Sequence, residues 1–227
     1  MLNRNKFVTS QSGFTLVEIA IVLVIIGLLL GGVLKGQELI ENAKIRNAIS
    51  DLNGVSAAYY GYIDRFKRLP GDDGPTQAAL TARGGLWATL GAAGFGNNDG
   101  VITNLGPATF TGALEGDNFW MQLKAAGLIA GNPADTGVNA LPRNAFTGLT
   151  GFTNDTTVLG AMPGNKVCMS EVPGKAARAI DTQLDDGLGA SGTIRATLGV
   201  AGQNTAPLAL IAAVYNDGSV YTICRGL

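Results

Sequence analysis

The stretch "GFTLVEIAIVLVIIGLLLGG" at residues 13–32 decides the fold of this chain. From Phe14 to Leu34 the only clearly polar residues are Thr15 and Glu18. As a helix, this run would be roughly 30 Å long, which is the thickness of the hydrocarbon core of a bilayer. A carboxylate at the centre of such a helix costs roughly 2.5–3.5 kcal/mol on insertion scales. A segment that served only as an anchor would leave it out, so we interpret Glu18 as a functional residue.

The residues before this run set its orientation in a membrane. Arg4 and Lys6 stand in a short polar leader, and positive charges stay on the cytoplasmic side, so the rest of the chain is expected to be exported. An ordinary secretory signal has an apolar region of about 7–15 residues followed by a small-residue cleavage site. This run is longer, and no A-x-A site follows it. The pattern therefore favours a membrane helix over a plain signal peptide.

The apolar pattern continues beyond the membrane segment as one stripe. Its members recur every three or four residues, as on one face of an amphipathic helix: Ile45, Ile49, Leu52, Val55, Tyr59, Tyr62 and Phe66. No proline interrupts the pattern until Pro70, in the turn "RLPGDDG". The sequence predicts one continuous helix over residues 14–66. Residues 14–34 would form its transmembrane part, and residues 35–66 its amphipathic part.

A family resemblance rests on the leader, the glycine and the run that follows. A short basic leader, Gly13 and then "FTLVEIAIVLVIIGLL" resemble the class III signal of type IV pilins and of the pseudopilins of type II secretion. The resemblance implies that a prepilin peptidase removes residues 1–13 by cleavage between Gly13 and Phe14. It also implies N-methylation of the new Phe14 amine and a role for Glu18 in filament assembly. The chain departs from many type IV pilins at Lys35, where those proteins carry a proline.

Electrostatics gives Glu18 and Phe14 a common role. A filament core of packed apolar helices holds little water, so an unpaired carboxylate there would be costly. The Phe14 amine of a neighbouring subunit has the opposite charge, and its pairing with Glu18 would fix one axial register. Local bending of the helix is expected at its glycines, which weaken a helix interior by up to about 1 kcal/mol each. These glycines are Gly27, Gly31, Gly32 and Gly36.

The remainder of the chain predicts a globular head, residues 67–227. Residues 67–164 are glycine-rich, with a short helix in "TQAALTAR" capped by Thr76 and another in "DNFWMQLKAAG" between an Asp117 N-cap and a Gly127 C′ residue. Residues 165–227 predict a strand in "NKVCMSEV", a helix in "GKAARAIDTQL" and a C-terminal hairpin of "LALIAAVY" and "VYTIC". The fold class is α+β, a long N-terminal helix packed on a head with a small antiparallel sheet and long ordered loops.

Two cysteines lie on predicted strands of the head. Cys168 and Cys224 are expected to form a disulfide, because an exported domain reaches an oxidising compartment. Two reduced, buried cysteines are the alternative. Closing a loop of this length would stabilise the head by roughly 4 kcal/mol in the chain-entropy model.

Composition restricts the chemistry. The chain has no histidine, which excludes Ser-His-Asp and Cys-His catalysis and histidine-ligated metals. Its formal net charge of -1 argues against nucleic-acid binding through a large basic surface. Four acidic turns offer the kind of oxygen ligands that calcium takes, but none has the EF-hand pattern and simple turns explain them better: "GDDG" at 71–74, "NNDG" at 97–100, "LDDG" at 184–187 and "NDG" at 216–218. No cofactor and no enzymatic activity are predicted.

These features predict a structural subunit of a type IV pilus or pilus-like filament. It would sit in the bacterial inner membrane, N-terminus in the cytoplasm and head in the periplasm, before entering an extracellular homo-oligomeric filament. Its partners would be the prepilin peptidase, the assembly machinery and further copies of itself. The alternatives are a type II secretion pseudopilin and a minor tip pilin that adheres or captures DNA. A membrane-anchored periplasmic enzyme is disfavoured by the missing histidine.

Overall fold

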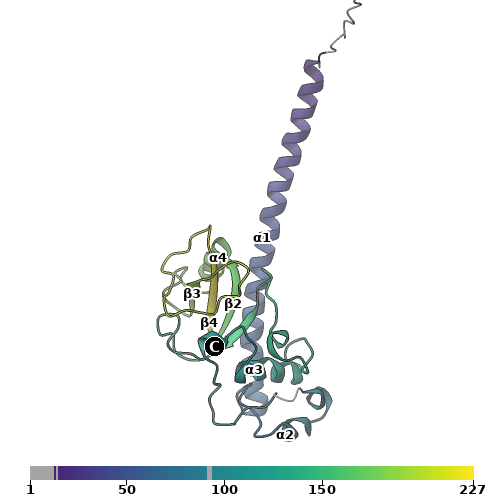
Figure 1. The fold of residues 1–227 in the computed structure, drawn as a ribbon. Coiled ribbons are helices and arrows are strands. Elements are labelled where there is room, and N and C mark those ends of the chain that lie inside the picture. The colour runs from purple at the N-terminus through teal and green to yellow at the C-terminus, as the bar shows by residue number, and fades with distance from the viewer. Residues whose placement is uncertain (1–12, 14, 91–93) are drawn as a thin grey trace, which may run out of the picture. The chain divides into compact units, whose positions relative to one another are not determined.

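The computed structural model describes residue 13, residues 15–90 and residues 94–227. The chain divides into two compact units, Met1–Asn42 and Ala43–Leu227. Helix α1, Leu16–Phe66, contributes to both (Figure 1). It ends at the residue that the sequence predicts, just before the turn that contains Pro70.

In the first unit, residues 16–42 are all helical. Every residue from Leu16 to Lys35 is exposed, and the most apolar window of α1 has a mean hydropathy of 2.8. Among the described residues, α1 is the one helix long and apolar enough to cross a membrane. No residue in that window is buried by the protein itself.

In the second unit, α1 supplies one wall of the hydrophobic core. Its buried residues follow the predicted stripe closely: Ile45, Ala48, Leu52, Val55, Ala58, Tyr59 and Tyr62. Helix α3, Leu114–Ala125, packs against this wall, with the rings of Tyr59 and Phe119 centred 6.3 Å apart. Phe119 in turn stacks on Phe152 of the sheet at 4.4 Å. The core therefore joins α1, α3 and the sheet through aromatic side chains.

In the described part of the chain, four antiparallel strands form a sheet in the order β1-β2-β4-β3. They are β1 (Thr150–Thr153), β2 (Lys166–Pro173), β3 (Ile194–Leu198) and β4 (Val220–Gly226). Cys168 of β2 lies opposite Cys224 of β4, and the two form the disulfide that the sequence predicts. Helix α4, Gly174–Leu184, has the predicted bounds and lies beside β2, β3 and β4 (Figure 1).

The predicted C-terminal hairpin is wrong in its first strand. "VYTIC" does form β4, but "LALIAAVY" at residues 208–215 is not a strand. A strand has two edges, and those of β4 are taken by β2 and by β3, whose sequence "IRATL" buries Ile194 and Ala196. Residues 208–215 lie outside β3 and reach its backbone through the Ala212 N–H, which donates to the Ala196 carbonyl at 2.8 Å.

Helix α2, Gln77–Thr81, begins as predicted. Thr76 is its N-cap, and the Thr76 hydroxyl accepts from the Ala79 N–H at 3.3 Å. Short 3₁₀ helices cover Gly85–Thr89, Gly106–Ala108 and Gly137–Ala140.

Helix α3 corrects one expectation and confirms another. It begins three residues before Asp117, so Asp117 is not its N-cap; the carboxylate instead accepts from the Gly137 N–H at 3.0 Å. Gly127 is the C′ residue, with φ +72°, where a side chain would be strained. The Gly127 and Leu128 N–H groups each donate at 3.0 Å to carbonyls in the last turn, which closes the helix in a Schellman motif.

Candidate assembly site on the N-terminal helix

The first turn of α1 is capped by Thr15 and contains Glu18. The Thr15 hydroxyl accepts from the Glu18 N–H at 3.2 Å, and the Thr15 carbonyl accepts from the Ile19 N–H at 3.3 Å. Thr15 is thus the N-cap and Glu18 the third helical residue, which is the spacing of a capping box. The positive end of the helix dipole favours a carboxylate at this position. The sequence analysis identified Glu18 but missed Thr15 as the N-cap, although the T-x-x-E spacing of a capping box indicates it.

The predicted processing point lies directly before this turn. Gly13 is exposed, and a Cβ atom added to it would meet nothing within 4 Å. Phe14 lies outside the described residues, as do residues 1–12. Cleavage after Gly13, methylation of the Phe14 amine and its pairing with Glu18 therefore stay predictions.

The surface around Glu18 is apolar on all sides. Leu16 is 87% exposed and Leu28 is 73% exposed, and the side chains between them are also exposed. A Cβ atom added to Gly27, Gly31 or Gly32 would meet nothing, so no contact within this unit requires glycine there. The helix continues unbroken past Lys35, which lacks the ring that makes proline disrupt a helix. Lys35 forms an exposed ion pair with Glu38 at 2.8 Å.

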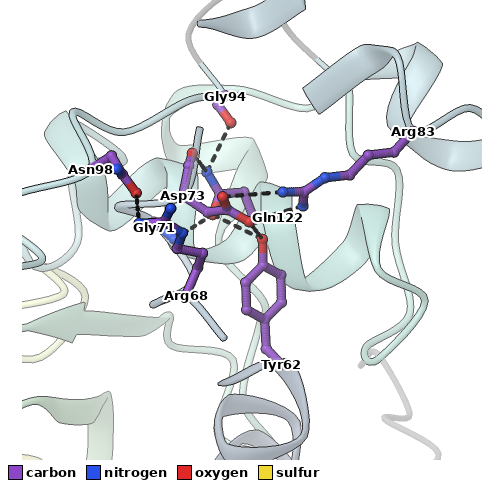
Figure 2. Close-up of polar contacts among 8 residues, drawn as sticks. All are labelled: Tyr62, Arg68, Gly71, Asp73, Arg83, Gly94, Asn98 and Gln122. Atoms are coloured by element: carbon purple, nitrogen blue, oxygen red, sulfur yellow. Dashed lines mark hydrogen bonds and ion pairs between the residues drawn. The ribbon is translucent and has the colours of Figure 1, made fainter. Parts of the chain in front are cut away.

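A second polar cluster, the Asp73 network, lies at the other end of α1 (Figure 2). The Tyr62 hydroxyl donates to the Asp73 carboxylate at 2.7 Å, and Arg83 donates to both oxygens of that carboxylate at 2.8 and 3.2 Å. Gln122 of α3 donates to the Asp73 carbonyl at 2.9 Å and accepts from the Gly71 N–H at 2.6 Å. Burial and the nearby carboxylate raise the pKa of the Tyr62 hydroxyl, which keeps it a donor. The network ties α1 to α3 and to the "GDDG" turn.

The acidic turns have structural roles of their own. Asp72 accepts from the Asp99 and Gly100 N–H groups at 3.1 and 2.8 Å, which joins the "GDDG" turn to the "NNDG" turn. Asp217 of the "NDG" turn pairs with Arg178 at 2.9 Å. In the "GDDG", "NNDG" and "NDG" turns, these carboxylates therefore hold loops in place through hydrogen bonds and an ion pair.

The "LDDG" turn brings its two carboxylates close to a third one, on α4. Asp181, Asp185 and Asp186 have oxygen atoms within 4.8 Å of one another, and carboxylate oxygens are the ligands that calcium prefers. Each carboxylate already accepts hydrogen bonds from protein donors, for example Asp181 from the Tyr215 hydroxyl at 2.5 Å. Burial, and then the two neighbouring carboxylates, raise the pKa of Asp181.

Comparison with known proteins supports the interpretation of the N-terminal stretch. A family model described as a prokaryotic N-terminal methylation motif matches residues 9–34. No match was found among curated proteins. The chain therefore carries a prepilin-type class III signal, the motif typical of type IV pilins and pseudopilins, as the resemblance indicated. With its long N-terminal helix and its antiparallel sheet, it is a pilin-like protein of the α+β class.

Proposed function

We propose that this chain is a structural subunit of a type IV pilus or pilus-like extracellular filament. The observation that carries the proposal is the exposed apolar surface of α1 from Leu16 to Leu34, which begins at a capped turn containing Glu18. A continuous apolar surface of this size marks a membrane or protein interface. The bilayer would cover it before assembly, and the helices of other copies would cover it in the filament.

Cleavage after Gly13 would place a new amine next to the helix. Phe14 would become the first residue, directly before the N-cap Thr15, so its positive charge would lie at the positive end of the helix dipole. A carboxylate from elsewhere would stabilise that amine. In a dry helix bundle, Glu18 of a neighbouring copy is the group of matching charge, and the pair would penalise slips in axial register.

Each part of the chain would have its own role in the filament. Residues 1–13 would be the leader removed by the prepilin peptidase, and residues 14–34 the membrane segment and then filament core. Residues 35–66 would link it to the region 67–164 and to the disulfide-bonded region 165–227. The subunit would be anchored in the inner membrane before the assembly machinery adds it to the filament. A tip subunit has no neighbour above it, so Glu18 favours a repeated subunit over a minor tip pilin.

The variant Glu18→Val tests the proposal. Export, cleavage and membrane insertion should stay intact, while fibre yield falls sharply because the register-fixing pair is lost. Glu38→Val is the matched control: it removes a glutamate from the same helix whose exposed ion pair with Lys35 contributes little. Fibres are measured by immunoblot of sheared and membrane fractions. Wild-type fibre yield from Glu18→Val would show that the glutamate is only tolerated, and loss of secretion without loss of surface fibres would favour a pseudopilin.

A further inference from the structure

The four acidic turns share a dipeptide that has a chemistry of its own. Each contains aspartate followed by glycine, at residues 73–74, 99–100, 186–187 and 217–218. In such a pair the glycine nitrogen can attack the aspartate Cγ atom, because glycine has no side chain that hinders a close approach. The new N–Cγ bond closes a succinimide ring, and a carboxyl oxygen leaves as water. Addition of water to the α-carbonyl of the ring breaks the original peptide bond and gives isoaspartate, whose backbone contains an additional methylene group.

At residues 99–100 the structure opposes this attack. The Gly100 N–H donates to the Asp72 carboxylate at 2.8 Å, so the attacking nitrogen is engaged. The Asp99 carboxylate accepts from the Val101 N–H and from the Asn97 side chain, each at 2.9 Å. Asp72 is itself buried, which shields its hydrogen bond from water. Ring closure would require these hydrogen bonds to break first.

Two further pairs are held in a similar way. The Gly187 N–H donates to the buried Asp181 carboxylate at 3.1 Å, and the Asp186 carboxylate accepts from the Leu188 N–H at 2.8 Å and from a serine hydroxyl. The buried Asp73 carboxylate is bound from three sides in the Asp73 network. Neither aspartate can turn its Cγ atom toward the next nitrogen without losing those contacts.

The fourth pair, residues 217–218, lies in a different environment. The Asp217 side chain is 60% exposed, and its ion pair with Arg178 is open to solvent. Exposed ion pairs of this kind contribute little. The Gly218 N–H donates at 2.9 Å to the side-chain oxygen of Asn216, which is exposed as well, so water can replace this acceptor. Both reacting groups are therefore free to move.

We infer that Asp217 is the site at which this chain forms isoaspartate, and that hydrogen bonds protect the other three aspartates. The inference is independent of the proposed function, because it concerns the chemistry of the turns alone. Each hydrogen bond that must break first slows ring closure roughly fivefold. The change would also disturb the sheet, since the Ser219 carbonyl accepts from the Gly174 N–H at 2.9 Å and so joins the residue before β4 to the first residue of α4.

Peptide mapping of aged protein tests the inference. The full-length chain is kept for several weeks at neutral pH in a non-ionic detergent and is then digested with the protease Asp-N, which cuts before aspartate but not before isoaspartate. Asp217 should be converted roughly tenfold more than any of the other three aspartates, because each of those is held by additional hydrogen bonds. Equal conversion at the four positions, or none at Asp217, would overturn the inference.

A denatured sample separates protection by the fold from the intrinsic reactivity of each dipeptide. In guanidinium chloride with the disulfide reduced, the four aspartates should be converted at similar rates. If Asp217 still reacts much faster than the others there, the hydrogen bonds are not the cause and the inference is wrong.

The variant Gly218→Ala tests the role of the attacking nitrogen in the folded chain. Gly218 is not among the glycines with positive φ, and an added Cβ atom would meet only the Asn216 Oδ1 atom, at an ordinary distance of 3.5 Å. The variant should therefore fold as the wild type does, with its disulfide and its denaturation midpoint unchanged. Isoaspartate at position 217 should fall roughly tenfold, because the methyl group hinders the nitrogen. Unchanged conversion would contradict the proposed reaction.

Discussion

Asp117 is a buried carboxyl group in α3, and replacing it with asparagine should remove a loss of stability that the second unit undergoes as pH rises to neutral. The residue is 6% exposed, and its Oδ1 atom has no hydrogen-bond partner in the described part of the chain. Loss of solvent raises its pKa to about 6, against the opposing effects of the Gly137 N–H and of Lys124. The folded state therefore holds this proton more tightly than the unfolded state does.

The size of the effect follows from the two pKa values. A raised pKa contributes stability below the unfolded value of 3.8, and that contribution is lost as pH rises through about 6. Between pH 3.5 and pH 7 the loss is about 3 kcal/mol, since each pKa unit corresponds to about 1.4 kcal/mol. About half of it should appear by pH 5. Asp117→Asn cannot ionise, so its stability relative to the wild type should rise by about 3 kcal/mol over this range.

The assay is urea unfolding of the full-length chain in a non-ionic detergent at pH 3.5, 5 and 7. Tryptophan fluorescence reports the transition, because both Trp87 and Trp120 are buried in the second unit. Any pH-independent cost of packing the asparagine amide cancels when the three pH values are compared. Asp217→Asn is the control, because its carboxylate lies in an exposed ion pair. An Asp117→Asn difference that stays constant from pH 3.5 to pH 7 would refute the reasoning.

Three further predictions concern processing, the disulfide and a buried lysine. The mature protein should begin at a methylated Phe14, and Gly13→Glu should retain the leader; intact mass decides both, and a mature chain that still begins at Met1 would contradict the proposal. Cys224→Ser should destabilise the second unit by about 4 kcal/mol, because the bond closes a loop with a sequence separation of 56; a denaturation midpoint equal to that of the wild type would be the contrary result. Lys166 is fully buried and donates to the Met162 and Gly164 carbonyls, and burial lowers its pKa to about 8. Stability should therefore rise by about 2 kcal/mol between pH 7 and pH 9.5 relative to Lys166→Met, and equal pH profiles would disprove this.

The sequence predicted best the elements whose signals are local and periodic. The end of α1 at Phe66 follows from an apolar stripe that stops before Pro70, and the bounds of α4 follow from one amphipathic segment. The pairing of Cys168 with Cys224 could be predicted because the chain has only two cysteines and an exported domain reaches an oxidising compartment. The α1 surface around Glu18 was predictable because composition alone sets it.

Elements that depend on competition between segments were not predictable in this way. Residues 208–215 have a stronger strand pattern than "IRATL", yet β3 takes the edge of β4 because its side chains complete the core. Asp117 has the residue type of an N-cap, but tertiary packing starts α3 a turn earlier and turns the carboxylate inward. The Asp73 network joins residues that are far apart in the chain, such as Tyr62 and Gln122. No local pattern in the sequence predicts these contacts.

The Asp73 network has a mechanical consequence for a filament whose subunits are joined through α1. The second unit begins at Ala43, and the Asp73 network holds the last turns of that helix within it. There, one carboxylate receives three hydrogen bonds, from Tyr62 and from two nitrogen atoms of Arg83, so the load is shared among bonds that must break together. Gln122 of α3 donates to the Asp73 carbonyl, so the network also joins the end of α1 to α3. In such a fibre, pulling the end of α1 out of the second unit would require these hydrogen bonds to break together.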